Sequence, residues 1–169
     1  MKFGKRCLLC CAAFLLLCCA SCANESKSET AQTAKASAYA DVKADADGFI
    51  AWPSDRVTAN VQFLNYDANG TTVQFLLLRD DAGAIHAAFN TCQSCSPSPK
   101  AYYVQQDGKL ICQNCGFDFT PQEVGIVHGG CNPWPVDGIE ITDTQIRIPA
   151  SSADAMAQTF AGWGGPTSE

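Results

Sequence analysis

The sequence has little of what proton-transfer catalysis requires. Only two histidines, His86 and His128, occur among its 169 residues, and no Ser-His-Asp set or pair of catalytic carboxylates stands out. It also contains no glycine-rich nucleotide-binding motif and no repeat of twenty or more residues. These absences leave enzyme activity as the weakest hypothesis.

Positive charge is scarce as well. Eleven Lys and Arg residues stand against 17 Asp and Glu residues, a net charge of −6. Loss of residues 1–21 would leave 8 basic residues and a net charge of −9. Such a surface repels nucleic acid and anionic lipid head groups. We therefore expect no nucleic-acid partner, and any membrane attachment should depend on a lipid.

No apolar run is long enough to span a bilayer. The longest, residues 7–20, follows a basic start and has the length of a signal-peptide core. It ends in Cys19-Ala20-Ser21-Cys22, which resembles a bacterial lipobox, although Cys19 stands where Leu is usual. We predict a lipoprotein signal peptide over 1–21, lipidation of Cys22 and an extracytoplasmic protein anchored to a bacterial membrane. An ordinary signal peptide cut nearby is the alternative.

The mature chain divides by composition. Residues 22–48 have almost no bulky apolar side chains, which predicts a disordered tether. About 120 residues remain, enough for one domain with one core. We expect a metal-binding domain over 49–150 and a carboxyl-terminal tail over 151–169.

Short alternating segments and turn residues predict a mainly β domain, a small barrel or sandwich of hairpins. The turns are Asp67-Ala68-Asn69-Gly70, Asp80-Asp81-Ala82-Gly83, Asp107-Gly108 and Thr142-Asp143-Thr144. One short helix is expected over 152–160, capped by Ser151 or Ser152 and ended by Gly162. The expected strands are 57–63, 73–77, 85–89, 102–105, 110–111, 139–141 and 146–148.

Five of the eleven cysteines lie between residues 92 and 131, and the other six lie within residues 1–22. Cys92-x-x-Cys95 and Cys112-x-x-Cys115 each follow an expected strand. A C-x-x-C turn of this kind is a knuckle, and two knuckles supply the four sulfurs of a soft-metal site. Cys131 is a fifth sulfur and a candidate further ligand, within a rigid Gly-Gly-Cys-Asn-Pro turn suited to a lid. His128 stands three residues earlier and offers a further ligand, although a lone loop histidine more often has no such role.

Three interpretations of these cysteines stay open. The predicted signal lacks a twin-arginine pair, so the chain is expected to cross the membrane unfolded and to meet an oxidising compartment with bare thiols. The first interpretation is an electron-transfer or iron-handling protein with an iron-sulfur cluster or another soft metal. The second is a structural zinc module that presents an interaction surface. The third is a thiol redox domain, or a domain stabilised by two disulfide bonds.

The order of strands and knuckles resembles that of a Rieske domain, in which two loops each supply one Cys and one His to a 2Fe-2S cluster. Cys95 and Cys115 stand where the histidines would be. The resemblance implies a site of four thiolates with a lower reduction potential than a Rieske centre.

A closer resemblance is to the FtrD-like family of bacterial membrane-associated iron-sulfur proteins. It is carried over about residues 55–148 by Ala88-Phe89-Asn90-Thr91-Cys92-Gln93-Ser94-Cys95, Cys112-Gln113-Asn114-Cys115-Gly116 and Gly129-Gly130-Cys131-Asn132-Pro133. The resemblance implies a 2Fe-2S or 4Fe-4S cluster, with zinc as the alternative. It also implies a role in electron transfer beside an iron permease or a periplasmic metal or redox protein. Unlike the membrane-embedded members, this chain has no run that could span a membrane.

Overall fold

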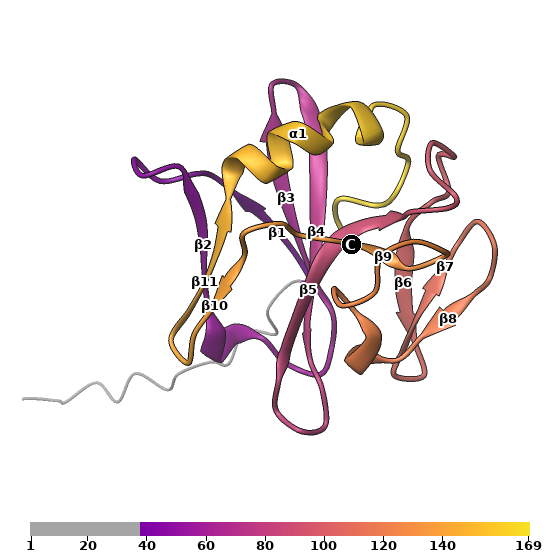
Figure 1. Cartoon of the computed structure of the whole chain (residues 1–169), viewed down its shortest axis with the longest axis horizontal. Helices are drawn as coiled ribbons and strands as arrows, with labels where there is room; N and C mark the ends of the chain where they lie inside the picture. Colours follow the sequence, from indigo (N-terminus) through magenta and orange to yellow (C-terminus); the bar gives the residue numbers. More distant parts are fainter. Residues whose placement is uncertain (1–37) are drawn as a thin grey trace, which may run out of the picture. The chain divides into compact units, whose positions relative to one another are not determined.

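The computed structural model describes residues 38–169, all within one compact unit (Figure 1). The predicted signal peptide, Cys22 and the first part of the tether lie outside the described residues. In chain order the elements are β1 (Tyr39–Val42), β2 (Phe49–Pro53), η1 (Ser54–Arg56), β3 (Gln62–Ala68), β4 (Thr71–Arg79), β5 (Ile85–Cys92), β6 (Tyr103–Gln106), β7 (Lys109–Cys112), β8 (Asp118–Phe119), η2 (Pro121–Glu123), β9 (Pro133–Pro135), β10 (Glu140–Ile141), β11 (Gln145–Pro149) and α1 (Ala150–Phe160).

The strands form three sheets in the described part of the chain. The largest has the order β1-β3-β4-β5-β9, and two three-stranded sheets have the orders β10-β11-β2 and β6-β7-β8. The prediction of a mainly β fold with one carboxyl-terminal helix is confirmed. The sheets are open, so the barrel offered as one form of the prediction is wrong for residues 38–169.

The β3-β4 hairpin turns at Asn69 and Gly70, as predicted. Both residues have positive φ, 55° and 90°, and the Gly70 N–H donates to Asp67 Oδ1. The strand before this turn begins at Gln62 and not at Val57. The reason is that the Arg79 guanidinium binds the carbonyl oxygens of Val57 and Ser54, which keeps them out of the sheet ladder.

Residues 39–42, which composition placed in the disordered tether, form β1. This strand pairs in parallel with β3, and the Tyr39 ring stacks on Phe63 with centroids 5.1 Å apart. The prediction of a tether up to residue 48 is therefore wrong at its end. An unpaired β3 edge would offer backbone groups to any extended segment, and β1 satisfies them.

Helix α1 begins two residues earlier than predicted and has no serine cap. It starts directly after β11, with Pro149 as its N-cap residue. The Ser152 hydroxyl donates to the Pro149 carbonyl oxygen instead of accepting from a backbone N–H. One face of the helix, with Ala153, Met156 and Phe160, is buried against the core.

Two hydrophobic clusters share strand β4. Val73, Phe75 and Leu77 belong to the cluster that includes α1 and β11, whereas Leu76 and Leu78 belong to the cluster that includes Cys92 and Cys112. Successive strand side chains point to opposite faces, so a strand covered on both faces is apolar throughout. The cysteines thus end strands that belong to a packed core.

A chain of buried amides crosses the main sheet toward the cysteines. The Gln74 amide donates to Asn65 Oδ1 at 2.7 Å, and the Asn90 amide donates to Gln74 Oε1 at 2.7 Å. Asn90 Oδ1 then accepts from the Tyr103 backbone N–H at 2.8 Å. Gln74 and Asn90 are almost fully buried, so each amide depends on the next for its hydrogen bonds.

Replacement of Gln74 by Leu should destabilise the fold by about 2–4 kcal/mol, because the Asn90 and Asn65 amides each lose a buried partner. Chemical unfolding followed by circular dichroism measures this change. Gln158→Leu, the same substitution on the exposed face of α1, should change the free energy of unfolding by less than about 0.5 kcal/mol. Equal effects of the two changes would contradict the role assigned to the amide chain.

Candidate metal centre

The first knuckle begins where β5 ends. Cys92 is the last residue of that strand, and its carbonyl oxygen accepts from the Ser96 N–H at 2.9 Å. The Cys95 carbonyl oxygen accepts from the Ser98 N–H at 2.9 Å. These bonds turn the chain back on itself, so the two cysteines share one side of a tight loop.

The second knuckle begins where β7 ends. Cys112 is the last strand residue, and its carbonyl oxygen accepts from the Gly116 N–H at 2.8 Å. Gly116 has φ +73°, a conformation that side chains disfavour, which explains the glycine at this place. The loops are tied together directly, since Ser98 Oγ lies 2.7 Å from Asn114 Oδ1.

The knuckles bring four sulfurs together. The Sγ atoms of Cys92, Cys95, Cys112 and Cys115 all lie within 4.8 Å of one another, and those of Cys95 and Cys112 are 3.9 Å apart. All five core cysteines are free thiols. Cys92 and Cys112 are buried, Cys95 is half-buried and Cys115 is exposed. Four sulfurs at this spacing are compatible with binding of a soft metal ion.

The surroundings of the thiols differ in their effect on ionisation. Burial raises the pKa of Cys112 and of Cys95. The backbone N–H groups of Cys115 and Asn114 partly offset this at Cys112. Burial also acts to raise the pKa of Cys115, but the Phe117 N–H and the neighbouring thiols outweigh it, and the net pKa is lowered. The lowered pKa favours the thiolate form of Cys115, which is the form that binds metals.

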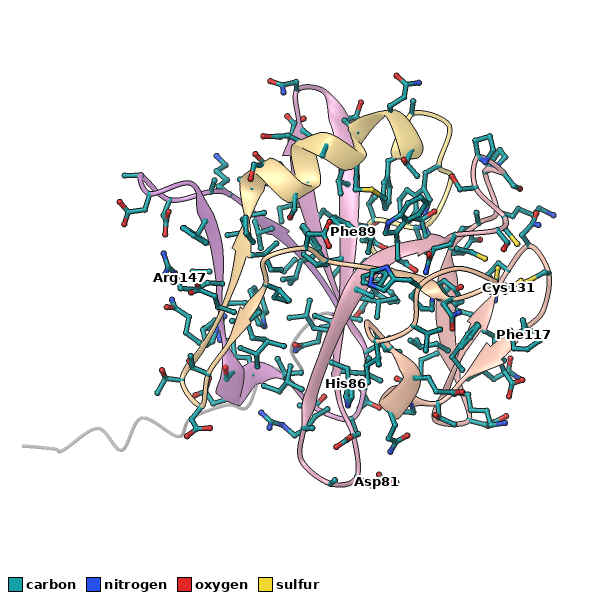
Figure 2. All side chains as sticks on the ribbon, viewed as in Figure 1. Asp81, His86, Phe89, Phe117, Cys131 and Arg147 are labelled. Carbon is teal, nitrogen blue, oxygen red and sulfur yellow. The ribbon has the colours of Figure 1, made fainter. Side chains whose placement is uncertain are left out.

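Cys131 lies beside the four sulfurs on a separate loop (Figure 2). Burial, and then the neighbouring Cys115 thiol, raises the pKa of Cys131 to about 11. The Cys131 sulfur does not belong to the group within 4.8 Å. Its backbone carbonyl accepts from the Tyr103 hydroxyl. The fifth cysteine is thus a neighbour of the site on its Cys115 side.

The loop that carries Cys131 is held over the first knuckle by Gln93. The Gln93 amide donates to the Val127 carbonyl oxygen at 3.2 Å and accepts from the Gly129 N–H at 2.7 Å. Gly125, at the start of the loop, lies so close to β5 that an added Cβ would be 2.3 Å from the Ala87 oxygen. These contacts fix the position of the loop against the site.

The two histidines stand apart from the sulfur group. His128 is exposed on the loop before Cys131 and is not in the group of potential ligands found among residues 38–169. His86 Nε2 lies 2.9 Å from Asp80 Oδ2, and its Nδ1 lies 3.3 Å from the Val124 oxygen. Both ring nitrogens of His86 therefore have partners outside the sulfur group.

Tyr103 is the main residue of the site that the sequence prediction missed. It is fully buried, lies opposite Cys112 in the β6-β7 register, and packs edge-on against Phe119. Burial, and then a hydrogen bond to Cys92, raises the pKa of its hydroxyl. The Asp107-Gly108 turn could have predicted this position for Tyr103. A two-residue hairpin turn at Asp107-Gly108 pairs residue 103 with residue 112.

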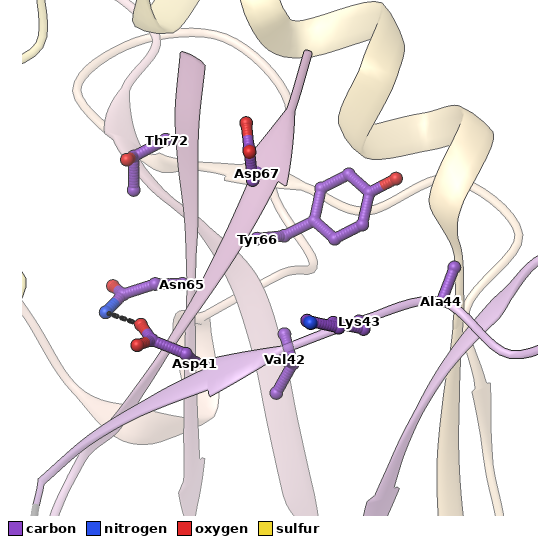
Figure 3. A pocket seen from close by; sticks show the side chains of 8 residues that line it. All are labelled: Asp41, Val42, Lys43, Ala44, Asn65, Tyr66, Asp67 and Thr72. Atoms are coloured by element: carbon purple, nitrogen blue, oxygen red, sulfur yellow. Dashed lines mark hydrogen bonds between the residues drawn. The ribbon is translucent and has the colours of Figure 1, made fainter. Parts of the chain in front are cut away.

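A separate hollow of about 440 Å³ lies against β1 and β3 (Figure 3). Its lining includes Asp41, Lys43 and Tyr66, and an Asn65 amide donates to Asp41 Oδ1 at 3.0 Å. It contains no cysteine or histidine. The sulfur group, and not this hollow, is therefore the candidate functional site.

A mainly β domain with four cysteine sulfurs gathered at two strand ends is compatible with the binding of a soft metal. The chain belongs to the FtrD-like family: the family model described as "Membrane iron-sulfur containing protein FtrD-like" matches residues 57–160. This match extends beyond the predicted domain end at residue 150 and includes α1. No curated protein matches the chain, and no solved structure does. The Rieske-like layout stays a prediction.

Within residues 38–169, no helix combines the length and the apolar character needed to span a bilayer.

Proposed function

We propose that this chain is an extracytoplasmic lipoprotein that holds an iron-sulfur cluster or another soft metal and serves electron transfer or iron handling. The observation that carries metal binding is the gathering of four cysteine sulfurs within 4.8 Å at the ends of two strands. The iron-sulfur alternative rests on the match to a family described as membrane iron-sulfur containing. A bound iron ion or iron-sulfur cluster would supply a one-electron redox centre.

The exposure of the site favours electron transfer over a purely structural role. Cys115 is exposed, and Phe117, two residues later, is 58% exposed. Ile126 and Val127, on the loop held by Gln93, are also exposed apolar residues. An apolar surface beside an exposed thiolate would let a redox partner approach the metal closely.

The predicted position of the protein supports the choice of partner. Lipidation at Cys22 would place the domain at a bacterial membrane, on a tether that ends at β1. A membrane iron permease or a periplasmic metal or redox protein is the partner we propose. The scarcity of positive charge argues against nucleic acid.

Purification from the native host without oxygen tests the proposal. An electron-transfer or iron-handling role should give visible absorbance, bound iron and an electron paramagnetic resonance signal in one redox state. A colourless protein with one zinc, unfolded by chelators, would favour the structural zinc module. A metal-free protein with the five core cysteines oxidised or in disulfides would overturn the proposal.

A further inference from the structure

The spacing of the four cysteine sulfurs limits how many metal ions fit between them. We infer that the site holds a single ion in a tetrahedron of four thiolates, and not a polynuclear cluster. The inference depends on the proposed function in that Cys92, Cys95, Cys112 and Cys115 must be metal ligands. It specifies the chemistry of the cofactor as one thiolate-bound ion, iron or zinc.

The observed distances match one tetrahedral ion. With metal–sulfur bonds of about 2.3 Å, sulfurs on the corners of a tetrahedron lie roughly 3.8 Å apart. The sulfurs of Cys95 and Cys112, which come from different knuckles, are 3.9 Å apart. No pair among the four exceeds 4.8 Å. Sulfurs from opposite knuckles are therefore close enough to bind the same ion.

A cluster would require wider spacing between most of the sulfurs. In a 2Fe-2S cluster two thiolates bind each iron, and in a 4Fe-4S cluster each thiolate binds its own iron. Thiolates on different irons are separated by the metal–metal distance in addition to their own bonds, and bridging sulfides occupy the space between the irons. A group whose members are all within 4.8 Å lacks this space.

The protein around the sulfurs holds the knuckles at the closer spacing. The Cys92 N–H donates to the Ala101 oxygen at 3.0 Å, and the Gln113 N–H donates to the Tyr102 oxygen at 2.8 Å. Each bond joins one knuckle to the segment that leads into β6. Cys92 and Cys112 are also buried in one hydrophobic cluster. Moving the knuckles apart would break these bonds and open the packed cluster.

A single ion also explains why Cys131 is not a ligand. Four thiolates complete a tetrahedron, so the fifth sulfur has no coordination position to fill. Cys131 lies outside the group of four, and the Tyr103 hydroxyl holds its backbone carbonyl beside the site.

Cobalt titration of the full-length chain tests the number of ions. The protein is stripped of metal under reducing, oxygen-free conditions and titrated with Co²⁺, whose thiolate complexes absorb visible light. We expect saturation at one Co²⁺ per chain. The protein as isolated should contain one iron or one zinc and no acid-labile sulfide. A coloured one-iron protein identifies iron as the ion, and a colourless one-zinc protein identifies zinc, and both results support the inference.

Two serine variants sharpen the test. Cys131→Ser should still saturate at one Co²⁺, and its absorption bands should shift because the neighbouring thiol is altered. Cys115→Ser, the same change at a ligand, should weaken Co²⁺ binding at least 100-fold.

Two or four irons per chain with matching labile sulfide, or saturation at two Co²⁺, would overturn the single-ion inference and leave the proposed function standing. Loss of binding in Cys131→Ser would also overturn the inference alone. No binding of any metal would overturn both.

Discussion

Cys112→Ser is expected to abolish stoichiometric metal binding and to destabilise the domain by several kcal/mol. Cys112 is a member of the sulfur group and is almost fully buried, in the same hydrophobic cluster as Cys92 and Tyr103. A ligand that binds only the folded state stabilises it, and a 100-fold loss of affinity removes up to about 2.7 kcal/mol of that stabilisation. The buried serine hydroxyl costs about 1–3 kcal/mol more if it finds no partner.

Metal analysis and chemical unfolding, each with and without added metal, measure the two parts of this effect. With metal present, Cys112→Ser should unfold at lower denaturant than the unchanged protein. After metal removal the difference should shrink to the packing cost alone. Cys131→Ser is the matched control, since it changes a sulfur beside the site and should leave the metal bound. Equal metal loss at all five core cysteines would refute the division between four ligands and one neighbour.

Tyr103→Ala should destabilise the fold by about 3–5 kcal/mol, the range found when a buried aromatic side chain is truncated. The Tyr103 ring is fully buried and contacts Phe119 edge-on at 5.8 Å. Its hydroxyl holds the Cys131 carbonyl and lies against the Cys92 thiol. The change would therefore leave a cavity under the knuckles and release the Cys131 loop. Chemical unfolding gives the free energy, and hydrogen exchange of residues 125–132 reports the loop.

Tyr103→Phe separates the ring from the hydroxyl. It keeps the packing and should cost only about 1 kcal/mol, the usual net value of one hydrogen bond. It should nevertheless raise hydrogen exchange in the Cys131 loop, because the carbonyl loses its donor. If Phe protected the loop as well as Tyr does, the hydroxyl would have no part in seating Cys131.

Much of the fold follows from local signals in the sequence. The Asn69-Gly70 and Asp107-Gly108 turns contain residues with positive φ, and the hairpins predicted around them form. Each knuckle was expected directly after a strand, and Cys92 and Cys112 are indeed the last residues of β5 and β7. These features could be predicted because they depend on residues only a few positions apart.

The errors arise where distant groups override local pattern. The Val57 segment alternates like a strand, but the Arg79 side chain holds its carbonyl in a loop. Residues 39–42 have the composition of a linker, yet the free edge of β3 recruits them as β1. Ser152 could cap a helix, but Pro149 begins the helix directly from β11. Arg79 and the β3 edge are more than twenty positions from the residues that they redirect, whereas Pro149 is only three positions from Ser152.

The sequence by itself determined the mainly β class and the two knuckles that supply four sulfurs. It also determined the resemblance to the FtrD-like family. It could do so because strand alternation, turn residues and the C-x-x-C spacing are short-range properties. Only the tertiary structure decided that sulfurs from the two knuckles lie as close as 3.9 Å, that Cys131 lies beside Cys115, and that Tyr103 is buried against the site. These facts depend on packing between segments up to forty positions apart, since the cysteines begin at residue 92 and end at 131. The spacing, which no linear pattern contains, is what points to one metal ion.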